Sequence, residues 1–230
     1  MRRLFTLGLI ALVAVITGCA NNANIDTNKD YWQHKPNTVV IVTTHTDKPQ
    51  YADENAGSRG AIVEIVNLLS TQKLENHLNQ MDVDWYYQDL AEQFKEALVK
   101  ENIRVVVASE HPDLKSSTIF STNPKLNWPQ LAAEYNADQV LVLAMPFYGA
   151  RIPQQANLFA SAPPIEGVCV LYAELSDPQH TTIYWRHTSI VTKPVLNANQ
   201  PPDYPNLTQS IVDSRKMAEE ELLDSLRSGR

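Results

Sequence analysis

The spacing of hydrophobic positions changes several times along the chain, and each change predicts a helix or a strand. Residues 38–44 form a continuous run of β-branched and apolar side chains, which predicts a buried strand, and the residues after it predict a polar loop over 45–60. Residues 61–81 place apolar side chains at helical spacing with an offset in the middle, so one helix or two shorter ones are expected. Asp89 begins a further helix that ends near Asn102, and a short strand follows at 103–107.

The second half of the chain continues to alternate between helix and strand. Asn127 followed by Pro129 indicates a helix start, and that helix is expected to end around Asn136, before a strand at 139–144. Two strands at roughly 168–175 and 181–191 flank a polar turn, which is typical of a hairpin. The last helix, capped by Asn206, has an apolar face made of Leu207, Ile211, Ala218, Leu222 and Leu226. The order of elements predicts an α/β (or α+β) fold, a helix-covered mixed sheet with a C-terminal β-hairpin and a terminal helix.

The first nineteen residues have the pattern of an export signal. Arg2 and Arg3 precede an apolar run of about a dozen residues, which is too short to remain as a membrane-spanning helix. The quartet Ile16-Thr17-Gly18-Cys19 resembles the bacterial lipobox, in which the cysteine becomes the lipid-modified first residue of the mature protein. We therefore expect a lipoprotein signal peptide over 1–18 and acyl chains, palmitate among them, on Cys19.

The residues that follow Cys19 determine the expected localisation and domain organisation. Ala20 takes the place of the aspartate that retains enteric lipoproteins in the inner membrane, so the resemblance favours the outer membrane, with the domain facing the periplasm. The polar, Asn-rich stretch over 19–37 is predicted to be the lipidated cysteine with a flexible tether, and 38–230 a single periplasmic α/β domain.

Charge and glycine content exclude several classes of partner. The chain has a net charge of −7. Removal of the signal takes away two arginines and leaves −9, which argues against nucleic acid as a ligand. Five glycines remain after residue 18, and none of them is spaced as in a dinucleotide-binding motif or a P-loop. The six histidines have no zinc-ligand spacing. We expect neither a cofactor nor a metal.

Four residues are candidates for catalysis. Ser58 lies in Ala-Gly-Ser-Arg-Gly, a variant of the hydrolase nucleophile elbow, but no predicted strand precedes it. His45 and Asp47 follow the first predicted strand, where open α/β sheets place ligands, although the same residues are typical of a turn. Cys169 lies within a strand-like apolar run and is interpreted as a buried structural thiol.

Residues 146–167 are predicted to be a long loop with four prolines. The loop carries aromatic side chains together with an arginine, a composition typical of protein contact surfaces. The residues proposed for partner contact are Phe147, Tyr148, Arg151 and Phe159. The alternative is that the same side chains fold back and cover the sheet.

The phrase Leu131-Ala-Ala-Glu-Tyr-Asn-Ala-Asp-Gln-Val-Leu-Val-Leu143 resembles a passage shared by a group of envelope lipoproteins. The group includes LpoB-type activators of penicillin-binding proteins, CsgG and, more distantly, the N-terminal domain of TolB. The resemblance covers about 85–192 and implies a compact α/β domain used for protein contacts, without assigning a role to any residue.

Sequence reasoning therefore favours an outer-membrane lipoprotein whose non-catalytic periplasmic domain acts as a scaffold or assembly factor. The membrane, reached through the lipid anchor, and another envelope protein are the expected partners. Two alternatives stay open: an envelope hydrolase that uses Ser58 or His45, and a protein that binds a small ligand.

Overall fold

The computed structural model describes residues 23–27, 29–45, 49–53, 72–81, 87–108, 127–152, 165–195, 204 and 206–228. The helices among them are α2 (Lys29–Gln33), a helix over 72–80, α4 (Tyr87–Val99), α6 (Trp128–Tyr135) and α7 (Leu207–Ser228). The strands are β1 (Thr38–His45), β2 (Gln50–Asp53), β3 (Arg104–Val107), β4 (Gln139–Ile152), β5 (Glu166–Ser176) and β6 (Ile183–Pro194). None of the described helices is long and apolar enough to span a bilayer.

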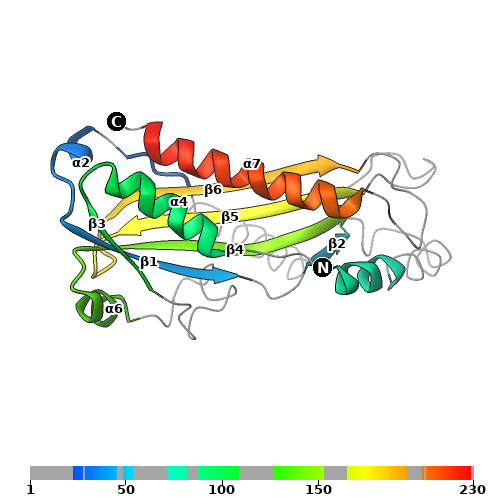
Figure 1. Cartoon of the computed structure of the whole chain (residues 1–230), viewed down its shortest axis with the longest axis horizontal. Helices are drawn as coiled ribbons and strands as arrows, with labels where there is room; N and C mark the ends of the chain where they lie inside the picture. The colour runs from blue at the N-terminus through cyan, green and yellow to red at the C-terminus, as the bar shows by residue number, and fades with distance from the viewer. Residues whose placement is uncertain are drawn as a thin grey trace, which may run out of the picture.

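The strands form one mixed sheet in the order β3-β1-β4-β5-β6, with β2 paired to the far end of β4. The strands β1, β2, β3 and β4 run parallel, whereas β4, β5 and β6 form an antiparallel meander (Figure 1). Strand β1 lies between two parallel neighbours, which explains why residues 39–42 are continuously apolar and fully buried. The predicted class, an α/β fold with a helix-covered mixed sheet, a hairpin and a terminal helix, is confirmed.

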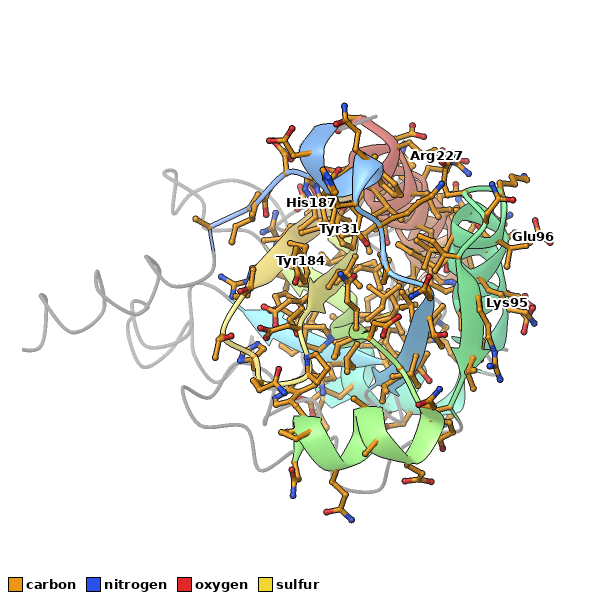
Figure 2. The ribbon with its side chains drawn as sticks, turned by 90° about the vertical axis from the view of Figure 1, so that its left-hand side faces the viewer. Tyr31, Lys95, Glu96, Tyr184, His187 and Arg227 are labelled. Carbon is orange, nitrogen blue, oxygen red and sulfur yellow. The ribbon has the colours of Figure 1, made fainter. Side chains whose placement is uncertain are left out.

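Helices cover the two faces of the sheet unequally. Helices α4 and α7 lie on one face, where they bury most of the core (Figures 1 and 2). Helix α6 covers only one end of the opposite face, over β1 and β4. The side chain of Asn127 accepts a hydrogen bond from the Gln130 N–H at 3.2 Å, and Asn136 ends α6 in the left-handed conformation. Both predicted ends of this helix are confirmed.

The terminal helix packs directly on the hairpin. The five predicted apolar positions of α7 are all fully buried, and the helix contacts β5 and β6 along its length. Gly167 permits this close approach, because a Cβ atom at that position would lie 2.6 Å from the backbone of Ser210 and Ile211. At the other end of the hairpin, Asp177 closes the turn by accepting hydrogen bonds from the N–H groups of Thr181 and Thr182 at 2.7 and 3.2 Å.

The prediction of a loop over 146–167 is wrong at both ends. Strand β4 continues to Ile152, and β5 already begins at Glu166. A β-bulge between Ala144 and Phe147 accommodates Pro146, which has no N–H to give to the ladder. Residues 153–164 lie outside the described part of the chain.

Residues 45–60 were predicted to be a polar loop, yet Gln50–Asp53 forms β2 beside β4. Of the predicted helical region 61–81, the described part is a helix over 72–80 that buries Leu74 and Leu78.

The prediction of a flexible tether over 19–37 also differs from the structure in its described part. Residues 23–27, which we call the N-terminal strap, lie along the outer edge of β6, and residues 29–33 form α2. Thr27 and Tyr31 are buried against the domain. The packed part of the protein therefore includes the N-terminal strap and α2, ahead of the predicted domain start at 38.

Candidate functional site

The predicted contact residues occupy different environments. Tyr148 is only 1% exposed and belongs to the core, so its ring has no surface to offer a partner. Arg151 donates to Glu166, with Nη2 and Oε2 2.7 Å apart. Phe147 is partly exposed on β4, and Phe159 lies outside the described residues.

Strand pairing brings Phe147 into a row that the sequence prediction did not contain. Phe147 on β4 is opposite Val170 on β5, and Val170 is opposite Ile190 on β6. The neighbours of Val170 along its strand, Cys169 and Leu171, are buried beneath α7. The alternation of side chains along a strand therefore places Val170 and its two partners on the opposite face. We call Phe147, Val170 and Ile190 the apolar row.

Exposure rises along the apolar row toward the edge of the sheet. Phe147 and Val170 are partly exposed, and Ile190 is 62% exposed, the most of the large hydrophobic side chains that the structure describes. Single exposed apolar residues are common, but three in register across neighbouring strands form a continuous strip. One ion pair, Arg151 with Glu166, lies on the same face further along β4 and β5. An apolar centre with a charged margin is the usual composition of a protein interface.

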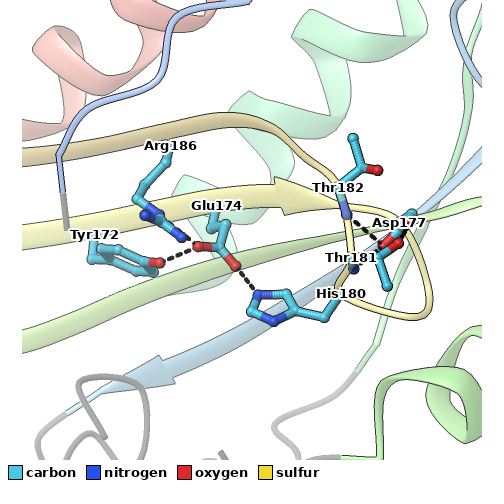
Figure 3. Close-up of polar contacts among 7 residues, drawn as sticks. All are labelled: Tyr172, Glu174, Asp177, His180, Thr181, Thr182 and Arg186. Carbon is cyan, nitrogen blue, oxygen red and sulfur yellow. Dashed lines mark hydrogen bonds and ion pairs between the residues drawn. The ribbon is translucent and has the colours of Figure 1, made fainter. Parts of the chain in front are cut away.

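A buried charged cluster lies on the same face of the hairpin, nearer the turn. Glu174 is only 4% exposed, and its carboxylate accepts hydrogen bonds from Tyr172 at 2.5 Å and from Arg186 Nε at 2.7 Å (Figure 3). Its other oxygen lies 2.5 Å from Nε2 of His180. The His180 ring stacks on Trp128 of α6, with ring centroids 5.2 Å apart and planes 7° from parallel. The cluster therefore joins β5, β6, the turn and α6.

The pKa values in this cluster follow from mutual stabilisation. Burial alone would raise the pKa of Glu174, but hydrogen bonds from His180, Tyr172 and Arg186 together lower it. The hydrogen bond with Glu174 raises the pKa of His180, against burial, which lowers it. Burial, followed by the charge of Glu174, raises the pKa of Tyr172. Since the carboxylate is charged and fully engaged, its role is to hold the hairpin rather than to move a proton.

A second polar network joins β6 to α7. Ser225 Oγ accepts a hydrogen bond from Trp185 Nε1 at 3.2 Å and lies 3.0 Å from Nδ1 of His187. On the other side of the ring, His187 Nε2 is 3.6 Å from Oε1 of Glu221, and Oε2 of the same carboxylate accepts a hydrogen bond from Ser189. A serine, a histidine and a carboxylate are thus aligned, but the serine oxygen is already bonded to an indole N–H within a helix–sheet contact. This arrangement fixes α7 on the sheet.

Most of the candidate catalytic residues lie outside the part of the chain that the structure describes. Ser58 and Asp47 lie outside the described residues, as does Cys19, and for His45 only its backbone place at the end of β1 is given. The hydrolase alternative therefore stays a prediction. Cys169 is fully buried, and burial raises the pKa of its thiol, which confirms the structural interpretation. Within the described ranges, no three His, Cys, Asp or Glu residues are grouped so as to hold a metal ion.

Sequence reasoning missed Glu174, Arg186 and Ile190. A signal was present for Glu174, which is a charged residue directly after the apolar run Val168–Ala173, whereas Arg186 lies in a strand with several other polar residues. Pairing them required the register of the hairpin, and that register includes a bulge between Leu175 and Ser176. No sequence signal distinguishes Ile190 from the buried aliphatic residues nearby.

Comparison with known proteins gives matches only at the level of solved structures. No protein-family model and no curated protein sequence matches the chain. Lipoprotein GNA1162 from Neisseria meningitidis is 14% identical, with 81% of this chain and 99% of that chain covered and a TM-score of 0.34. PelC from Paraburkholderia phytofirmans, described as a dodecamer, is 13% identical over 84% and 88%, with a TM-score of 0.34. The LpoB C-terminal domain from Salmonella enterica is 17% identical over 69% and 85%, with a TM-score of 0.21. Structures similar to this chain thus include bacterial lipoproteins, but at these values function has to be argued from the residues of the chain itself.

Proposed function

We propose that the chain is an outer-membrane lipoprotein, anchored through Cys19, whose periplasmic domain binds another envelope protein as a scaffold or assembly factor. The observation that carries the protein contact is the apolar row, with Ile190 62% exposed at its end. The lipobox at 16–19 supports the anchor. The three side chains of the apolar row are enough for the centre of an interface, since a few central residues supply most of the binding energy at protein interfaces.

The edge position of β6 supports the same proposal. Beyond Thr188, no hydrogen bond or bridge from another described strand reaches the outer edge of β6. An open edge offers N–H and C=O groups to an incoming chain. A partner that covers Ile190 therefore gains both apolar contact and access to these backbone groups.

The anchor is tested by the chemistry of the mature terminus. Mass analysis is expected to find a triacylated cysteine at position 19, and the Cys19→Ser variant is expected to leave the membrane fraction. An unmodified terminus, or a serine variant that still fractionates with membranes, would contradict the anchor.

The protein contact is tested by site-specific crosslinking in cells. A photo-reactive residue at position 190 is expected to trap one envelope protein, and Phe147→Ala in the same chain is expected to reduce that capture several-fold. Val99 is the matched control position, because it is also exposed, at 51%, but lies at the end of α4 near the opposite edge of the sheet. Equal capture of the same protein from positions 190 and 99 would contradict a contact through the apolar row.

A further inference from the structure

The N-terminal strap fixes the point at which the chain leaves the domain. The Ile25 N–H donates to the Arg186 carbonyl at 2.7 Å, and the Arg186 N–H donates to the Ile25 carbonyl at 2.8 Å. Asn24 Oδ1 accepts a hydrogen bond from the Thr188 N–H at 2.9 Å. The strap thus forms an isolated antiparallel bridge with the outer edge of β6.

Contacts of Thr27 and of helix α2 hold the strap in place. Thr27 Oγ1 donates to the Leu226 carbonyl of α7 at 3.5 Å and accepts a hydrogen bond from Trp32 Nε1 at 3.2 Å. Tyr31 of α2 packs on Tyr184 of β6, with ring centroids 5.4 Å apart (Figure 2). The strap and α2 are therefore built into the packed domain, next to the C-terminal half of α7 (Figure 1).

The chain between the strap and Cys19 is short. Five residue steps separate Cys19 from Asn24, and a fully extended chain covers at most about 18 Å over that length. The flexible tether predicted from sequence would reach about 60 Å at full extension. The difference decides how far the domain can turn on its anchor.

The width of the sheet exceeds the extended length of the segment from Cys19 to Asn24. Strands β3 and β6 are the two edges of the main sheet and are four strand spacings, or about 19 Å, apart before side chains are added. To turn β3 toward the bilayer, the chain from Asn24 would have to pass around the domain, which is further than it reaches. The acyl chains hold Cys19 at the membrane surface.

We infer that the strap orients the domain, with the outer edge of β6 toward the bilayer and the β3 edge away from it. This inference rests on the lipid anchor of the proposed function. Ile190 is two residues from Thr188 and so lies about 7 Å along β6 from the strap. The apolar row is then close to the membrane surface, and the partner that it binds is itself a membrane-bound protein.

The orientation is tested with the full lipidated protein in vesicles that contain no other protein. The vesicles are made of phosphatidylethanolamine and phosphatidylglycerol, with a fraction of the lipids spin-labelled on the headgroup. A fluorescent probe is attached to Ile190→Cys or, as the matched control, to Val99→Cys. The native thiols do not interfere, because Cys169 is fully buried and Cys19 carries the lipid. Headgroup quenching is expected to be at least threefold stronger at 190 than at 99.

A spacer variant separates orientation from simple proximity. Twenty Gly/Ser residues inserted between Ala20 and Asn21 leave the strap intact and make the segment from Cys19 to Asn24 longer than the domain is wide. The difference between positions 190 and 99 is expected to shrink toward equality. Equal quenching of the two positions without the spacer, or an undiminished difference with it, would overturn the inferred orientation.

The same vesicles distinguish this inference from the function on which it rests. Failure of the protein to associate with vesicles overturns the anchor itself, whereas association with equal quenching overturns only the orientation. Stronger quenching at 190 by lipids brominated in their acyl chains than by headgroup labels would assign Ile190 to the lipid. That result supports the orientation but contradicts the proposed protein contact.

Discussion

The two ends of the β5–β6 hairpin carry opposite chemistry on the same face of the sheet. Near the turn, the charged residues Glu174 and Arg186 are largely buried and hydrogen-bonded to each other. Four residues away from that pair along each strand, the apolar Ile190 is mostly exposed at the margin of the sheet, opposite Val170. Ordinary burial would give the reverse distribution, with the charges outside and the isoleucine inside.

The difference shows which end serves the fold and which end is available to other molecules. A buried carboxylate with three partners is costly to disturb, so its residues are committed to holding the hairpin against α6. An exposed isoleucine contributes little to the stability of the isolated domain. The polar end therefore fixes the geometry of the apolar end.

Removal of the buried carboxylate tests the first half of this contrast and has the largest expected effect. Glu174→Ala leaves Arg186 without its buried partner, and breaking a buried ion pair costs about 3–5 kcal/mol of unfolding free energy. The matched control is Glu166→Ala on the same strand and face, whose ion pair with Arg151 is more exposed. The control is expected to lose about 1 kcal/mol or less. Urea unfolding of both variants measures the difference, and similar losses would show that the buried carboxylate of Glu174 holds the hairpin no more than a more exposed ion pair does.

The pH dependence of stability sharpens the role of the turn. His180 has its pKa raised in the folded state, so its protonated form stabilises the fold fully below about pH 6.5, the ordinary histidine value. The contribution is lost as the pH rises through the folded-state pKa. Glu174 has the opposite sign: its pKa is lowered by folding, so its contribution is present above its ordinary pKa of 4.5 and is lost as the pH falls through the folded value.

The charged groups that face His180 determine whether stability rises or falls as the pH increases above neutrality. Glu174 and Asp177 favour the protonated ring, and Arg186 opposes it. His180→Asn is the suitable variant, because residue 180 has φ of 55° and asparagine tolerates that conformation. Wild-type stability is expected to decline above about pH 6.5 more steeply than that of the variant in urea unfolding between pH 5.5 and 8.5. Parallel profiles of unfolding free energy against pH would show that protonated His180 does not stabilise the cluster.

The predictability of the two regions differs for a physical reason. Elements that bury their own apolar pattern could be predicted from the sequence, as β1, α7 and the hairpin were. The caps of α6 could also be predicted, because Asn127 and Asn136 act on backbone within a few residues. In these cases local chemistry and tertiary packing favour the same structure.

The strap and the apolar row could not be predicted in this way. The Asn-rich composition around Asn24 is typical of a tether, but in the structure this segment pairs with the outer edge of β6. The continuation of β4 beyond Ala144 likewise depends on β5 as a partner, with a bulge at Pro146. Position along the chain carries no information about these pairings, which arise from contacts distant in sequence.

Ile190→Asp tests the second half of the contrast and has the smallest expected effect on stability. Because the side chain is mostly exposed, the substitution is expected to change the unfolding free energy by no more than about 0.5 kcal/mol. Crosslinking from a photo-reactive residue at position 147 in the same chain is nevertheless expected to fall several-fold, since a carboxylate at the margin of the row opposes an apolar contact. Val99→Asp, at a position that is 51% exposed at the end of α4, is expected to leave the crosslinking unchanged. A loss of 1.5 kcal/mol or more for Ile190→Asp alone would place Ile190 in the packed domain, and both ends of the hairpin would then serve the fold.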